Sequence, residues 1–283
     1  MRLFDPAHAL HYCSRPIASG GGILQSLRSL HQTTRSGSLL AEGSARYDLH
    51  RANALAATER WLMYSACLYR RSIEMLVPAL APWAHVSLYY ASYFSANAIL
   101  AMHGAWVSSV RSRTIIVDVE AGAPGSQCLR VTSGSGAMSP NGARGSHRIF
   151  WDHYYGSASV LTAWVPPKMA SAFQPVNGTY HWQTDARNEA NYDMHQAWES
   201  SKLMATAFNP ARLKSLSGPM AVQMEACEVL CRTAIHFAKA YKLDVGGLAG
   251  GGFDGDRSAI TRRLTKQRPP SLLNQSKFDE LVA

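Results

Sequence analysis

Residues 88–104 read LYYASYFSANAILAMHG, an apolar segment that follows Pro82 in the chain. Apolar positions such as Leu88 and Ile99 recur at the spacing of a helix, and alanine and serine occupy much of the remaining surface. Because small side chains let neighbouring helices approach closely, the segment is predicted to be a helix packed tightly against others.

Three further helices are expected around this one. Apolar residues between Leu55 and Leu76 recur at helical spacing until Pro78, which predicts an amphipathic helix of about 25 residues. Another helix is expected to begin near Asp185, a residue type that caps helices well. A last one is expected over residues 219–241. The chain is therefore predicted to be mainly α, with a core of four long helices.

Between residues 112 and 146 the pattern changes from helical spacing to alternation. Residues 114–119 and 128–132 are rich in β-branched and apolar side chains and flank a Gly/Pro/Ser turn, which predicts a β-hairpin. A Gly/Ser loop follows the second of these segments. The hairpin and loop are interpreted as a small insertion in a helical domain.

The flanking regions have a different composition. Residues 1–48 alternate short apolar pieces with Gly/Ser clusters and are predicted to form an N-terminal arm. Residues 244–283 begin with a glycine-rich run that lacks the Gly-Lys-Ser/Thr ending of a phosphate loop, so they are predicted to be a linker and a basic tail. The helical domain is thus expected to span residues 49–243.

Composition limits the classes of function. The chain of 283 residues is 47% hydrophobic and carries a formal charge of +9, which favours an acidic partner, with nucleic acid ahead of a membrane surface. No apolar run is long enough to cross a bilayer, so we expect no membrane insertion. Five scattered cysteines fit a reducing, cytoplasmic setting. Cys227 and Cys231 have no second pair at metal-ligand spacing, and we expect neither a metal nor a cofactor.

The first candidate site follows Asp185. A helix there would place Arg187 in its first turn, Asn191 one turn later and His195 two turns on. An arginine that holds a phosphate and a histidine that titrates near neutrality are the minimal parts of a metal-free RNA cleavage site, in which the 2′-hydroxyl attacks the neighbouring phosphate. We therefore expect Arg187 to bind the scissile phosphate, His195 to act as acid or base, and Asn191 to orient one of them.

The second candidate site is the segment SHRIFWDHYY at residues 146–155, with two histidines, an arginine and four aromatic residues. Charge beside aromatic faces is typical of platforms that bind single-stranded nucleic acid, which favours Trp151 and Tyr154 as stacking residues. Arg148 and His153 form a second candidate catalytic pair.

Each site also has a purely structural alternative. Arg187 would then pair with a nearby acid, and His195 would lie on a solvated helix face. The aromatic residues of 146–155 would pack that segment onto the helical bundle.

Two segments together resemble HEPN domains, named for higher eukaryotes and prokaryotes nucleotide-binding. Residues 88–104, LYYASYFSANAILAMHG, resemble the aromatic and alanine-rich helix of that superfamily. Residues 187–193, RNEANYD, resemble the start of a later helix, and a long final helix follows them. The resemblance covers residues 50–110 and 145–242 and leaves the arm, the hairpin and the tail unexplained.

The resemblance implies an up-and-down four-helix bundle that forms a homodimer and acts without a metal ion. It also implies an endoribonuclease of toxin, defence or RNA-processing systems, with a cognate antitoxin or defence-system protein as partner. Active members carry Arg, often Asn next, and then His after a short spacing. His195 lies one residue beyond that spacing from Arg187, whereas His153 lies within it from Arg148. The alternative is a non-catalytic member that binds RNA or a protein.

Basic residues of the C-terminal tail are expected to help hold RNA. A flexible cationic tail contacts phosphates without reading sequence, and each contact releases counterions. The alternative is that apolar residues of the tail dock it onto the bundle as a terminal helix. The three cations assigned to RNA binding are Arg262, Arg263 and Lys266.

Overall fold

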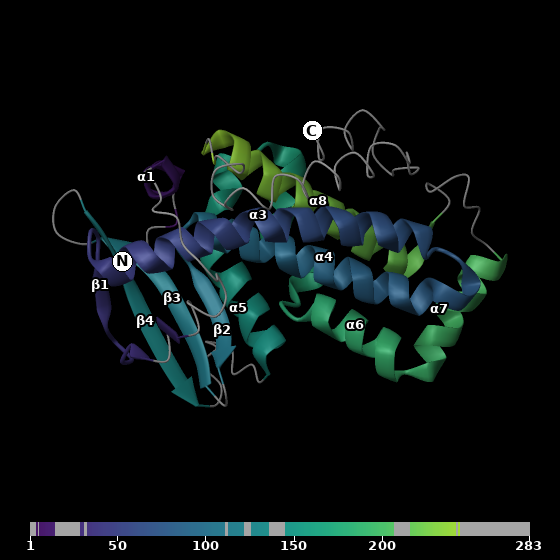
Figure 1. Ribbon diagram of the computed structural model, residues 1–283. Coiled ribbons are helices and arrows are strands. Elements are labelled where there is room, and N and C mark those ends of the chain that lie inside the picture. Colours follow the sequence, from purple (N-terminus) through teal and green to yellow (C-terminus); the bar gives the residue numbers. More distant parts are fainter. Residues whose placement is uncertain are drawn as a thin grey trace.

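The computed structural model of the chain is mainly helical and contains a small four-stranded antiparallel sheet (Figure 1). The helices form an elongated bundle, and the sheet lies at one end of it. The residues that the structure describes are 4, 6–14, 29–30, 33–110, 113–121, 126–135, 145–206, 216–241 and 243.

The first two long helices form a hairpin. Helix α3 (Ala45–Glu74) begins at Ser44, whose hydroxyl accepts a hydrogen bond from the Tyr47 backbone N–H at 3.3 Å. A short 3₁₀ turn, η1 (Pro78–Leu80), separates α3 from helix α4 (Ala81–Met102). Proline at this position removes a helical hydrogen bond, which explains why α3 ends before it. The helices predicted on both sides of Pro78 are therefore confirmed.

Helix α8 (Gly218–Ala240) packs against α3 and α4, and α3 and α4 lie side by side in Figure 1. Ser65 of α3 donates a hydrogen bond to the Ala91 carbonyl of α4 at 2.8 Å and lies 2.9 Å from the Cys231 sulfur of α8. Contacts this short between three helices require small side chains at the crossing, as the alanine and serine pattern of α4 predicted.

The long helix predicted from Asp185 is divided in two. Helix α6 (Trp182–Tyr192) starts three residues before Asp185 and ends at Asp193, where φ is −100° and ψ is 104°. Helix α7 (Met194–Thr206) then begins, and the Asp193 carboxylate accepts a hydrogen bond from the His195 backbone N–H at 2.9 Å. Asp193 thus caps α7, and an uninterrupted helix from Asp185 is wrong.

One more helix lies between the sheet and α6. Helix α5 (Ser146–Ala158) follows Gly145 and buries its aromatic residues. A connector that contains several prolines leads from α5 to α6. It forms short 3₁₀ turns, which are common in connecting segments. These turns are η2 (Ser159–Trp164), η3 (Pro167–Phe173) and η4 (Val176–Gly178).

The sheet has the strand order β1-β4-β3-β2. The predicted hairpin is confirmed, because Val117 pairs with Val131 in antiparallel register. The sheet is nevertheless larger than a hairpin, since strands from before α3 and directly after α4 flank it. The strands are β1 (Leu39–Ala41), β2 (Trp106–Val110), β3 (Arg113–Ala121) and β4 (Gln127–Ser135).

The described parts of the N-terminal region pack against this core, although an arm was predicted over residues 1–48. Helix α1 (Pro6–Ser14) buries Ala9 and Tyr12, and β1 pairs with β4. Arg51 of α3 donates a hydrogen bond to the Tyr12 carbonyl at 2.6 Å. Glycine and serine clusters in this part of the sequence concealed that the described apolar residues of α1 and β1 belong to the core.

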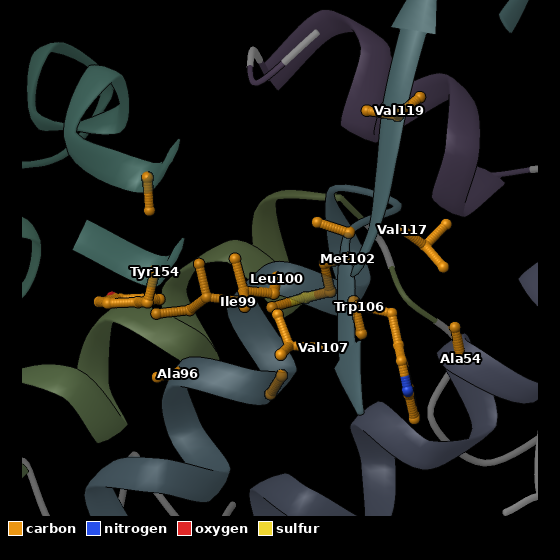
Figure 2. Packing of buried hydrophobic residues seen from close by; sticks show 14 of the residues in the cluster. Ala54, Ala96, Ile99, Leu100, Met102, Trp106, Val107, Val117, Val119 and Tyr154 are labelled. Carbon is orange, nitrogen blue, oxygen red and sulfur yellow. The ribbon is translucent and has the colours of Figure 1, made fainter. Parts of the chain in front are cut away.

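The core is continuous between the bundle and the sheet. Figure 2 shows Ile99 and Met102 of α4 close to Val107 of β2 and Val117 of β3. Gly104 makes the turn between α4 and β2 with φ of +74°, and a Cβ there would lie 3.2 Å from the Val119 Cβ. The turn therefore requires glycine both for its backbone conformation and for space.

Two absences hold within the described residues. No helix there is long and apolar enough to span a bilayer. No group of three or more His, Cys, Asp or Glu side chains is arranged to hold a metal ion in that part of the chain.

Candidate functional site

Arg187 and His195 lie in different helices. Arg187 is in the middle of α6 and His195 is in the first turn of α7, beyond the break at Asp193. The His195 side chain is exposed, and no contact between these two side chains occurs among the described residues. Asn191 is exposed as well, and the guanidinium instead donates a hydrogen bond to Asn188 Oδ1 at 2.7 Å. Asn188, and not Asn191, is therefore the asparagine that contacts the Arg187 guanidinium.

The side chains of the second predicted pair, Arg148 and His153, point to different sides of α5. Arg148 forms an ion pair with Asp185 of α6, at 2.5 Å. His153 is buried against the sheet, with its Nε2 3.3 Å from a carboxylate oxygen of Asp118 in β3. Positions five apart on a helix point to different sides, which explains why Arg148 and His153 do not meet.

The aromatic segment of α5 is core rather than surface. Trp151 and Tyr154 have 0% exposure, and the Tyr154 hydroxyl donates a hydrogen bond to the Ala172 carbonyl of η3 at 3.2 Å. Neither ring has a free face on which a base could stack, so the stacking role predicted for them is wrong. The tail residues Arg262, Arg263 and Lys266 lie outside the described residues.

The structure brings Arg187 close to a different histidine, His147. Both contact Tyr89 of α4: the Arg187 guanidinium carbon lies 5.3 Å from the centre of the Tyr89 ring, and His147 Nδ1 lies 2.6 Å from the Tyr89 hydroxyl oxygen. Three helices, α4, α5 and α6, thus each supply one side chain to a single cluster. We call Tyr89, His147 and Arg187 the Tyr89 cluster.

Electrostatics keep His147 in its neutral form. Burial lowers the pKa of the His147 imidazole below its ordinary value, and the positive charge of Arg187 lowers it further. With Nδ1 engaged by Tyr89, Nε2 is the ring nitrogen left without a hydrogen-bond partner among the described residues. A half-buried neutral imidazole with one unpaired nitrogen suits proton transfer at neutral pH.

Tyr89 has partners that fix its position. The Trp151 indole N–H donates a hydrogen bond to the Tyr89 oxygen at 3.4 Å, and the nearby Thr184 side chain lowers the pKa of Tyr89. Burial has the larger, opposite effect and raises the pKa of Tyr89, so its hydroxyl stays protonated. Tyr89 therefore serves as a fixed hydrogen-bonding partner for His147 rather than as a charged group.

The cluster also favours an anion. His147 lies in the first turn of α5, whose N-terminus has no side-chain cap, and the unpaired N–H groups of a helix N-terminus attract negative charge. The Nε atom of Arg187 is buried and has no hydrogen-bond partner in the described part of the chain. The guanidinium as a whole is half-buried beside a helix N-terminus, a position suited to hold a phosphate oxygen.

Sequence reasoning found Arg187 and missed the pairing with His147. His147 lies forty residues earlier in the chain, separated from Arg187 by the rest of α5 and the 3₁₀ connector. The sequence does show His147 within SHR at 146–148, at the start of an aromatic helix. It does not show which side chain His147 contacts in the fold.

Comparison of the chain with protein-family models, with curated proteins and with solved structures finds no match.

Proposed function

We propose that the chain is a metal-independent, HEPN-like RNA endonuclease in which Arg187 holds the scissile phosphate and His147 transfers the proton. The observation that carries this proposal is the convergence of a cation and a neutral imidazole on Tyr89. The neighbouring N-terminus of α5 and the formal charge of +9 add to it, since both favour a polyanion.

The reaction uses only groups of the chain and the RNA itself. His147 Nε2 accepts the proton of a 2′-hydroxyl, and the 2′-oxygen attacks the adjacent phosphorus atom. Arg187 binds the non-bridging oxygens, where negative charge accumulates. The bond from phosphorus to the 5′-oxygen breaks, and that oxygen takes the proton back from His147. The products are a 2′,3′-cyclic phosphate and a 5′-hydroxyl.

This role defines the tautomer of His147. For Nε2 to accept a proton, Nδ1 must carry a hydrogen and donate it to the Tyr89 oxygen. The Tyr89 hydroxyl hydrogen then turns toward the buried hydroxyl of Thr184, which has no partner within hydrogen-bond geometry in the described residues. Thr184 and Tyr89 therefore act as positioning residues for His147.

The experiment is incubation of the purified chain with total RNA in excess EDTA, with analysis of the new 5′ and 3′ ends. Wild type is expected to produce 5′-hydroxyl ends, and Arg187→Gln and His147→Gln are each expected to reduce the rate by on the order of 100-fold or more. His195→Gln is the matched control, because that side chain is exposed on α7, and it is expected to cleave like wild type.

Two results would reject the assignment. Cleavage lost in His195→Gln and retained in His147→Gln would return the catalytic role to His195. RNA that is bound and left intact at high protein concentration would identify the chain as a non-catalytic RNA-binding module.

The assembly and setting belong to the same proposal. A homodimer would bring two Tyr89 clusters to one RNA, and one arginine and one histidine per chain make a sparse site. A cytoplasmic location and an antitoxin or defence-system partner would accompany such an activity. A strictly monomeric chain in light scattering at micromolar concentration would contradict the dimer.

A further inference from the structure

A second polar cluster lies one helical turn before Tyr89. It consists of His85 of α4, Ser200 of α7 and Gln223 of α8, and we call it the His85 cluster. The Ser200 hydroxyl lies 3.2 Å from His85 Nε2, and Gln223 Oε1 lies 2.6 Å from His85 Nδ1. The three side chains therefore form a line of two hydrogen bonds through the imidazole.

The direction of both hydrogen bonds follows from the Gln223 amide. Its nitrogen donates a hydrogen bond to the His85 backbone carbonyl at 3.0 Å, so the amide oxygen must face the ring. An amide oxygen only accepts, and Nδ1 of His85 therefore carries the ring hydrogen. In the neutral ring Nε2 is then an acceptor, and the hydroxyl that donates to it is that of Ser200.

Neutral His85 is the expected form. The ring has 5% exposure, and burial lowers the pKa of His85 below its ordinary value of 6.5, with the bond to Gln223 acting in the opposite direction. A hydroxyl that donates to a neutral imidazole, itself oriented by a third group, is the arrangement of an activated nucleophile.

The cluster opens into a cavity of about 320 Å³, a volume typical of small-ligand sites. His85 and Ser200 line it, together with apolar side chains that include Leu203 and Met220. The first residues of α8 border the same cavity, and the Ser217 side chain makes no capping hydrogen bond there. Pro219 has no N–H group, so Gly218 and Met220 are the cavity-lining residues of that turn whose backbone N–H groups remain to stabilise an oxyanion.

We infer that the His85 cluster is a hydrolytic site for small esters, with Ser200 as the nucleophile, His85 as the general base and Gln223 as the positioning residue. Ser200 Oγ bonds to the carbonyl carbon as its proton passes to His85 Nε2. The ester bond then breaks, and the alkoxide leaves with that proton. Water, deprotonated by His85, releases the acid and restores Ser200.

The charge of the cavity sets the substrate class. Glu189 of α6 and Glu199 of α7 both line it and both are exposed. Two carboxylates repel a polyanion such as RNA, and the apolar walls favour hydrocarbon groups. The substrates are therefore uncharged or cationic esters with a small acyl group, and this site is separate in its chemistry from the Tyr89 cluster.

The experiment is covalent labelling of the full chain with a fluorophosphonate probe, mapped by peptide mass spectrometry. Ser200 is expected to displace fluoride and gain the phosphonyl group, and Ser200→Ala is expected to lose the label. Ser201→Ala is the matched control, because the neighbouring Ser201 hydroxyl donates to the Ala197 carbonyl and not to a base. We expect labelling at Ser200 to exceed labelling at Ser201 by on the order of 100-fold.

Hydrolysis of p-nitrophenyl acetate provides a second readout. Gln223→Ala is expected to slow it and Gln223→Glu to retain it, because glutamate also accepts from Nδ1 and a merely structural glutamine would not show this rescue. Labelling that is absent, that persists in Ser200→Ala or that survives in 8 M urea would overturn the inference. The failure is distinguishable from that of the RNA proposal, since Ser200→Ala is expected to leave RNA cleavage unchanged.

Discussion

His85 on α4 and His147 on α5, which contacts α4 one turn later at Tyr89, have different surroundings. The His147 side chain is half-buried and contacts the Tyr89 ring. The Arg187 guanidinium contacts the same ring. His85 is buried, is held by a serine and an amide, and borders a cavity with two carboxylates. Burial lowers the pKa of both. In the two proposals, the neutral imidazole of His147 serves an anionic substrate and that of His85 serves an uncharged one.

The largest expected effect is on stability and concerns Trp151, which packs against Tyr89. Trp151→Ala removes a fully buried indole under the Tyr89 cluster and is expected to cost about 3–5 kcal/mol in the free energy of unfolding. Trp198→Ala is the control, because that ring is 66% exposed on α7, and we expect a change within about 0.5 kcal/mol. Urea denaturation measures both. A Trp151→Ala protein as stable as wild type would restore a surface role for that ring.

A smaller effect is expected for the positioning of His147. Tyr89→Phe keeps the ring in the core and removes only the hydroxyl that bonds Nδ1, at a cost of about 1–2 kcal/mol in transition-state stabilisation, or roughly tenfold in kcat/KM for RNA cleavage. Gln223→Ala removes the corresponding partner of His85 and should leave RNA cleavage unchanged. Equal losses in the two variants would mean that the Tyr89 and His85 clusters are one site.

The helices and the sites were predictable to different degrees. Periodicity and prolines predicted α3, α4 and α8 because those helices bury a regular stripe against one another. The break at Asp193 was missed, although an aspartate that caps the next backbone N–H groups is a local signal. The partners of Arg187 and His85 come from helices far away in the chain, and no spacing rule encodes such contacts.

We expect the His85 cluster to make the stability of the protein depend on pH. Because the folded-state pKa of His85 lies below 6.5, the unfolded chain binds the proton more readily. The contribution of His85 to stability is therefore fully present above pH 6.5 and is lost as the pH drops toward the folded-state value. Glu189 and Glu199 are the acids that face this cavity. In urea titrations between pH 7.5 and 5, His85→Asn is expected to show a shallower loss than wild type, and an identical slope would contradict the argument.

The smallest effect is expected for the ion pair between α5 and α6. Arg148→Ala breaks the contact with Asp185, but both side chains are more than a third exposed, so the loss should stay below about 1 kcal/mol. RNA cleavage should remain close to wild type. A loss as large as that of Arg187→Gln would make Arg148 a phosphate ligand after all.

The most direct test of the account is the titration of His147 by NMR in wild type and in Arg187→Gln, with His147→Gln used to assign the resonance. The account predicts that the pKa of His147 lies below 6.5 in wild type and rises when the neighbouring positive charge is removed. A pKa of His147 that does not move in Arg187→Gln would contradict the claim that these two residues form one site.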